Sequence, residues 1–178
     1  MINYHMRTKN IKKKIKEYFF LNPTVRLRVR QIERELKLPL PSIIRYTKEL
    51  EQENVLKKTE ISNIRLYSAN RTSKNYKLQK TLFNIEQLQN LTDFLIKDYQ
   101  NPTIVVFGSY SKGEDIETSD IDLYLENIKN IKNIKKFENK LKRNIQLFQY
   151  KTIKDIKNKR LANNIINGFT LNGEVEVF

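Results

Sequence analysis

The stretch that most constrains the fold of this 178-residue chain is VVFGSYSKGEDIETSDIDLYLE, residues 105–126. A strand-like apolar run ends at Gly108-Ser109, and a second apolar run about ten residues later carries Asp120 and Asp122. Residues two apart on a strand project from the same face, about 7 Å apart along the backbone. The two aspartates therefore predict a strand with one face in the core and the other bordering a polar site.

The residue types at this site indicate its chemistry. Two carboxylates side by side on rigid β-structure suit Mg²⁺, which prefers a few carboxylates and completes its octahedron with water and phosphate oxygens. Backbone amides at the turn, together with the Ser109 hydroxyl, can cradle a triphosphate. We therefore expect Asp120 and Asp122 to bind the metal and act in catalysis. We expect Gly108, Ser109 and Lys112 to bind ATP or another NTP.

The residue pattern of this motif also resembles that of a known family. The signature of the polymerase-β-like nucleotidyltransferase superfamily is similar to two segments of this chain. They are Phe107-Gly108-Ser109 and, about ten residues later, Asp120-Ile121-Asp122-Leu123. Within that superfamily the motif resembles the minimal nucleotidyltransferases, with Lys112, Gly113 and Ser119 also in place. The resemblance covers residues 100–178 and implies a small α/β domain with a mixed sheet.

The same resemblance implies a third carboxylate on the following strand, where it helps to deprotonate the attacking hydroxyl. The expected strand IQLFQY has Gln146 at that position. An amide cannot accept the proton and adds no charge to hold a second ion. Glu174 and Glu176, in an expected terminal strand EVEVF, remain alternatives. Because loss of a general base costs about 10²–10⁴ in rate, we expect reduced or absent catalysis.

Charge separates the two halves of the chain. Residues 1–80 contain 20 Lys and Arg against 7 Asp and Glu, whereas residues 81–178 contain 14 against 13. Codon bias toward lysine would load both halves, so the excess in the first half points to a polyanionic partner.

The first half has the element order of a DNA-binding module. Helical patterns cover Thr8–Phe20 and residues 26–38, and a third begins at Ser42 with Ile43, Thr47 and Leu50 inward. A hairpin turning at Ser62-Asn63 follows. Residues 8–70 resemble the winged helix-turn-helix family, which implies that the third helix enters the DNA major groove. The expected DNA contacts are Ser42, Ile44, Arg45 and Lys48 on that helix and Lys57, Lys58 and Arg65 on the hairpin.

These contacts have different expected roles. The Arg45 guanidinium can bind guanine in bidentate fashion, whereas the hairpin cations would contact phosphates without reading sequence. Double-stranded DNA is favoured over RNA, because the deep, narrow major groove of RNA excludes a helix. Winged helices also mediate protein contacts, and that alternative stays open.

The predicted fold class is α+β, with a winged helix over 1–70, a linker and connecting helix over 71–99, and a nucleotidyltransferase-like domain over 100–178. Residues 71–80 have no periodicity, and a long amphipathic helix is expected from Thr81, with its apolar face listed as Leu82, Ile85, Leu88, Leu91 and Leu95. The chain has no cysteine and no apolar run long enough for a membrane span, so we expect a cytoplasmic protein.

Three functional hypotheses follow. The first is a DNA-binding transcription regulator whose second domain binds NTP with Mg²⁺ or has become a scaffold. The second is an active nucleotidyltransferase targeted by its winged helix. The resemblance gives this a concrete form, AMP transfer to a small helical partner protein by an antitoxin-like enzyme. The third is an interaction module that forms a homodimer along the Leu82–Leu95 helix.

Overall fold

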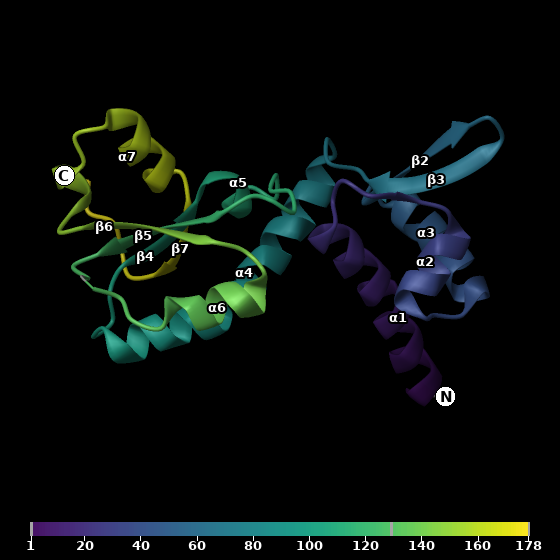
Figure 1. Cartoon of the computed structure of the whole chain (residues 1–178), viewed down its shortest axis with the longest axis horizontal. Helices are drawn as coiled ribbons and strands as arrows, with labels where there is room; N and C mark the ends of the chain where they lie inside the picture. Colours follow the sequence, from purple (N-terminus) through teal and green to yellow (C-terminus); the bar gives the residue numbers. More distant parts are fainter. Residues whose placement is uncertain (1, 129, 178) are drawn as a thin grey trace. The chain divides into compact units, whose positions relative to one another are not determined.

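The structure, a computed structural model, describes residues 2–128 and 130–177 and divides into two compact units, residues 1–80 and 81–178 (Figure 1). Each unit contains its own sheet, three-stranded in the first and four-stranded in the second. The predicted α+β class is confirmed. No helix in the described part of the chain combines the length and apolar character needed to cross a membrane.

The first unit consists of helices and an antiparallel sheet with the strand order β1-β3-β2. Its elements are α1 (Ile2–Leu21), β1 (Arg26–Leu27), α2 (Val29–Leu36), α3 (Leu40–Gln52), β2 (Leu56–Ile61) and β3 (Ile64–Ala69). The predicted inward residues of α3, Ile43, Thr47 and Leu50, are all fully buried. At the hairpin turn Ser62 and Asn63 have φ of 48° and 66°, the left-handed geometry that matches strand twist.

Three boundaries in this unit differ from the sequence prediction. Helix α1 begins at Ile2 rather than Thr8, and α3 begins at Leu40 because Pro41 is tolerated in the first turn of a helix. Residues 26–27 form strand β1, paired with β3, instead of the start of a helix. A two-residue strand is too short to show a period, so only the pairing reveals it.

The second unit is built on a mixed sheet with the strand order β6-β5-β4-β7, in which only β5 and β6 are parallel. The remaining elements are α4 (Lys74–Asp98), β4 (Ile104–Phe107), α5 (Gly108–Ser111), β5 (Ile121–Glu126), α6 (Ile134–Leu141), β6 (Ile145–Tyr150), η1 (Ile153–Asp155), α7 (Lys159–Ile166) and β7 (Phe169–Asn172). Helix α4 already begins at Lys74, so residues 74–80 are helical rather than an irregular linker.

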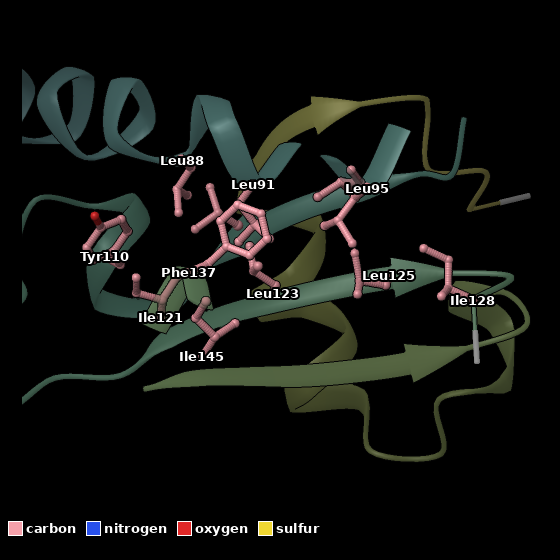
Figure 2. Packing of buried hydrophobic residues seen from close by; sticks show 12 residues of the cluster. Leu88, Leu91, Leu95, Tyr110, Ile121, Leu123, Leu125, Ile128, Phe137 and Ile145 are labelled. Atoms are coloured by element: carbon pink, nitrogen blue, oxygen red, sulfur yellow. The ribbon is translucent and has the colours of Figure 1, made fainter. Parts of the chain in front are cut away.

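Apolar side chains on both faces of this sheet form cores. On one face Leu88, Leu91 and Leu95 of α4 and Phe137 of α6 pack against strand residues (Figure 2). On the other face Ile165 of α7 packs against alternate strand residues, including Val105 and Tyr124. Leu82 was predicted on the inner face of α4, but it is 53% exposed, whereas its neighbour Phe83 is buried. The pattern of leucines alone therefore misplaces the start of the buried stripe.

The predicted C-terminal elements are partly wrong. The expected helix over 152–169 is divided, because Asn158 caps the new helix α7 by accepting from the backbone N–H groups of Arg160 and Leu161. Of the expected strand EVEVF, residues 174–177 form no strand and Phe178 lies outside the described residues, while β7 lies earlier, at Phe169–Asn172, paired with β4. Gly173, at φ +72°, ends β7, and a Cβ there would lie 2.6 Å from Thr103 Oγ1.

Candidate nucleotide and metal site

The turn between β4 and α5 brings the backbone against the Asp122 carboxylate. Gly108 has φ +73°, and a Cβ built on it would lie 2.3 Å from Asp122 Oδ2. Only glycine fits here, because the left-handed conformation and the close carboxylate both exclude a side chain. Helix α5 starts at this glycine without a side-chain cap, and its first turn includes Ser109. The fold thus brings the Gly-Ser turn and Asp122 together, and their predicted role as one binding site stays a prediction.

Strand β5 places the aspartates at its entry. Asp122 is half-buried and pairs in register with Phe107 on one side and Gln146 on the other. Asp120 directly precedes the strand and is exposed. Burial raises the pKa of Asp122 above its usual range, and the negative charge of Asp120 raises it further. A cation between the two carboxylates would relieve this repulsion.

The donor set fits one hard cation. Carboxylate oxygens from Asp120 and Asp122, with the amide oxygen of Gln146 on the same sheet face as Asp122, are the oxygen ligands that Mg²⁺ accepts. Within residues 2–128 and 130–177 no group of three or more His, Cys, Asp or Glu is arranged to hold a metal. The described residues therefore offer a two-carboxylate site. Asp120 also borders a concavity of about 430 Å³, whose other lining residues include Lys142 and Arg143.

Glu174 and Glu176 do not complete this site. They line a separate concavity of about 530 Å³ together with Glu126, at the exit of β5. Glu126 is four residues beyond Asp122, which is about 13 Å along a strand. The pKa of Glu126 is raised by burial, with Glu176 adding to the effect. The two glutamates that the sequence left open thus belong to the opposite end of the strand.

The position of Lys112 is less informative. Lys112 is the C-terminal cap of α5, where its backbone N–H bonds to the Ser109 carbonyl, and its side chain is exposed. Its predicted approach to a triphosphate stays a prediction.

Sequence reasoning missed three buried polar residues beside the site. Asp115, in the loop before β5, forms an ion pair of 3.2 Å with Arg143, which precedes β6. Asn84 of α4 also donates to Asp115, at 2.8 Å. These partners are 28 and 31 residues apart in the chain, so no local pattern could have connected them.

The residues predicted to read DNA lie on exposed parts of the first unit. On α3, Ile44 is 51% exposed, Arg45 and Lys48 are exposed, and Ser42 is half-buried. Arg45 Nε donates to Glu49 Oε1 at 2.9 Å, within the same helix. This exposed ion pair holds the guanidinium weakly, since such i,i+4 pairs contribute only about 0.3–0.5 kcal/mol.

The hairpin cations do not share one face. Lys58 and Arg65 lie on one face of the β2–β3 ribbon, because Arg65 pairs with Glu60 and successive residues alternate. Lys57 lies on the other face, opposite Ser68. The predicted phosphate contacts of these three residues stay a prediction, in which a flat surface would meet either Lys57 or the other two.

A basic groove that the sequence reasoning did not single out lies on the face of Lys57. It encloses about 510 Å³, and its described lining residues, none of them acidic, are Arg26, Arg28, Arg30, Gln31, Arg34 and Leu66. Arg26 and Lys57 both pair with Ser68 in register, so they flank it in one row across the sheet. The alternating arginines of RLRVR are visible in the sequence, but only the pairing of Arg26 and Leu27 with β3 shows that they border a groove.

The comparison with protein families matches most of the second unit. Residues 88–171 match the model described as the nucleotidyltransferase domain. The mixed sheet, the Gly-Ser turn and the two aspartates lie within the matched residues, so this part of the chain is similar to a nucleotidyltransferase domain in both sequence and fold. No curated protein matches the chain.

Proposed function

We propose that this protein binds duplex DNA through residues 1–80 and an NTP with one Mg²⁺ through its nucleotidyltransferase domain, with weakened nucleotidyl transfer. The observation that carries the nucleotide part of the proposal is the register of strands β4, β5 and β6. It places Asp122 beside the Gly-Ser turn on one side and beside Gln146 on the other. This arrangement supports binding of an NTP and Mg²⁺ more strongly than it supports removal of a proton from an acceptor hydroxyl.

The division of labour at the site follows from the residues. Asp120 and Asp122 would hold the cation, and the turn at Gly108 with the Ser109 hydroxyl would receive phosphate oxygens. The bound cation would neutralise charge on the phosphates during attack on the α-phosphorus and departure of pyrophosphate. At the third position, the Gln146 amide can orient an acceptor hydroxyl by a hydrogen bond but cannot remove its proton.

Three observations support the DNA-binding part. The excess of cations lies in residues 1–80, the outward residues of α3 are exposed, and four arginines surround the groove next to Lys57. Phosphate contacts supply a salt-dependent affinity that does not depend on base sequence. Arg45 and Ile44 on α3 would add contacts to base edges and so give sequence preference.

The DNA-binding proposal is tested by measuring duplex affinity over a salt series. Each lost phosphate contact should reduce the log–log salt slope by about 0.9. We expect Arg26→Gln/Arg28→Gln to reduce the slope by nearly two such steps without changing sequence preference. Arg45→Ala should weaken sequence preference. If isolated residues 81–178 bound duplex DNA as tightly as the full chain, that result would contradict the assignment of DNA binding to residues 1–80.

The competing function, active nucleotidyl transfer to a partner protein, is favoured by retention of both aspartates and the Gly-Ser turn. Incorporation of label from α-phosphate-labelled ATP, abolished by Asp122→Ala, would support it. A role in transcription regulation goes with the DNA-binding proposal. A small helical partner protein goes with active nucleotidyl transfer, as its acceptor. Self-association along α4 would be detected by sedimentation of the full chain.

A further inference from the structure

A buried polar network lies directly behind the aspartate site. Arg143 Nη2 donates to Asp115 Oδ2 at 3.2 Å, with the two side chains only 7% and 0% exposed. The other terminal nitrogen, Nη1, donates to two backbone carbonyls of the loop that leads into β5, those of Ile116 and Ser119. One guanidinium thus contacts three groups of a single loop.

The same network reaches the other half of the nucleotide motif. Asn84, 2% exposed on α4, donates from Nδ2 to Asp115 Oδ1 and to the Tyr110 carbonyl, both at 2.8 Å. Tyr110 belongs to α5 and is anchored in the core with Leu88 (Figure 2). The helix that starts at Gly108 and the loop that ends at Asp120 are therefore bonded to the same amide group.

Stability alone is a weak reason for such a network. Moving an aspartate and an arginine out of water costs free energy, and a well-packed apolar cluster often serves a fold equally well. Beyond packing, the ion pair fixes the orientation of the groups that the guanidinium contacts. The planar guanidinium fixes several acceptors at once in a fork geometry that an ammonium cannot reproduce. Here the fixed acceptors include the carbonyl of Ser119, the residue immediately before Asp120.

The loop itself is closed by a short turn. The Ser119 hydroxyl accepts from the Ile116 N–H at 2.9 Å, and the Ser119 N–H donates to the Ile116 carbonyl at 3.0 Å. Arg143 holds this turn from both ends. Because the Asp120 side chain is exposed, the direction of its carboxylate depends on the backbone that carries it.

We propose that Arg143 is a positioning residue, which acts through Asp115 and the carbonyls of Ile116 and Ser119 to aim the Asp120 carboxylate at the cation shared with Asp122. This inference rests on the proposed metal site and deepens it. It accounts for a buried ion pair at the entry of β5 that the binding groups themselves do not require. Removal of the outer partners that orient metal ligands typically costs about 10–100-fold in metal affinity.

The test uses Mn²⁺ alone as the probe, titrated into the full chain and followed by electron paramagnetic resonance. Arg143→Lys keeps the charge opposite Asp115 but cannot hold both carbonyls, and we expect a loss of affinity of about tenfold or more. Arg160→Lys is the matched control, because Arg160 is an exposed arginine on α7, and its affinity should equal that of the native chain. Asn84→Ser interrupts the network from α4 and should also weaken Mn²⁺ binding.

Hydrogen exchange supplies the second readout. In Arg143→Lys the backbone amides of residues 116–120 should exchange about tenfold faster, because local opening of the loop becomes easier. Faster exchange with native Mn²⁺ affinity would overturn the proposal, since the network would then only stabilise the loop. Unchanged exchange would overturn it as well. A native chain that binds no Mn²⁺ would refute the proposed metal site and the positioning role together, whereas native binding retained by Arg143→Lys refutes the positioning role alone.

Discussion

The two ends of strand β5 both carry acidic side chains, but among the described residues only the entry also adjoins the Gly-Ser turn of the proposed nucleotide site. At the entry, Asp122 lies against the glycine of a strand-to-helix turn and next to Asp120. At the exit, Glu126 shares a concavity with Glu174 and Glu176, and its described lining residues include no Gly-Ser turn. Carboxylates alone therefore do not define the site, because a phosphate ligand also needs backbone donors and a close, side-chain-free approach.

Restoring the missing carboxylate should give the largest change at the entry of β5. We expect Gln146→Asp to raise pyrophosphate release from ATP by about 10²–10⁴-fold, with water accepting the AMP group, because a general base would then stand beside Asp122. The measurement is release of pyrophosphate with Mn²⁺ or Mg²⁺ present. The control is Gln149→Asp, an exposed position on the opposite face of β6. Equal rates for the native chain and Gln146→Asp would contradict the assignment of this position.

Adding a side chain at Gly108, where the backbone lies against Asp122, should have the next largest effect. Gly108→Ala forces a Cβ to within 2.3 Å of Asp122 Oδ2 and keeps a residue with a side chain at φ +73°. The backbone conformation alone costs about 1–2 kcal/mol. We expect both a lower melting temperature and a loss of Mg²⁺-dependent ATP binding. Normal ATP affinity in Gly108→Ala would show that the nucleotide does not use this turn.

The pH dependence should distinguish Asp122 from an ordinary surface aspartate. Its pKa is raised in the folded chain by burial and by Asp120, so the folded state binds a proton more readily than the unfolded state. The ionised group then opposes folding once the pH exceeds the raised pKa. We expect Asp122→Asn to increase the melting temperature at pH 7, with the gain disappearing below the ordinary aspartate pKa of 3.8.

The same shift affects metal binding in the native chain. Protons compete with the cation for Asp122, so Mn²⁺ affinity should begin to fall at a higher pH than for an unperturbed aspartate. An Mn²⁺ titration repeated from pH 7 downward measures this. A melting temperature lower in Asp122→Asn than in the native chain at pH 7 would contradict the repulsion between the two aspartates.

The exit of β5 should show the smallest effect. Glu126→Gln/Glu176→Gln removes two carboxylates from the larger concavity, and we expect ATP affinity to stay within about twofold of native, because neither residue touches the nucleotide site. Folding should become slightly more favourable, since the raised pKa of Glu126 also reflects unfavourable burial of its charge. Calorimetry and thermal unfolding of the same sample measure both quantities. A large loss of ATP binding would indicate that the nucleotide binds at the exit of β5 and not at its entry.

The sequence signals at the entry of β5 are local. Alternation predicted Asp120 and Asp122 on one face, and glycine followed by serine predicted the turn. In the structure β5 begins at Ile121, directly after Asp120, and Asp122 lies against Gly108, while the roles of these residues stay predictions. The register of Gln146 beside Asp122 is also as predicted, since both strands were identified. Glu174 and Glu176 could not be placed, because the end of β7 depends on the close approach of Gly173 to Thr103.

What the sequence could not predict depends on long-range contacts. The bonds from Arg143 and Asn84 to Asp115 join segments that only the fold brings together. Strand β1 is visible only through its pairing with β3. Leu82 is 53% exposed while Leu88 is buried, and the spacing of leucines does not specify where along α4 the buried face begins.

The central claim is that the entry of β5 is a working nucleotide and metal site, and calorimetry tests it most directly. ATP is titrated into the full chain with and without Mg²⁺, and into Asp120→Ala/Asp122→Ala. We predict binding that requires Mg²⁺ and that the double variant loses by about 100-fold or more, since both metal ligands are removed. Absence of binding at millimolar ATP, or binding that survives in the double variant, would contradict the account.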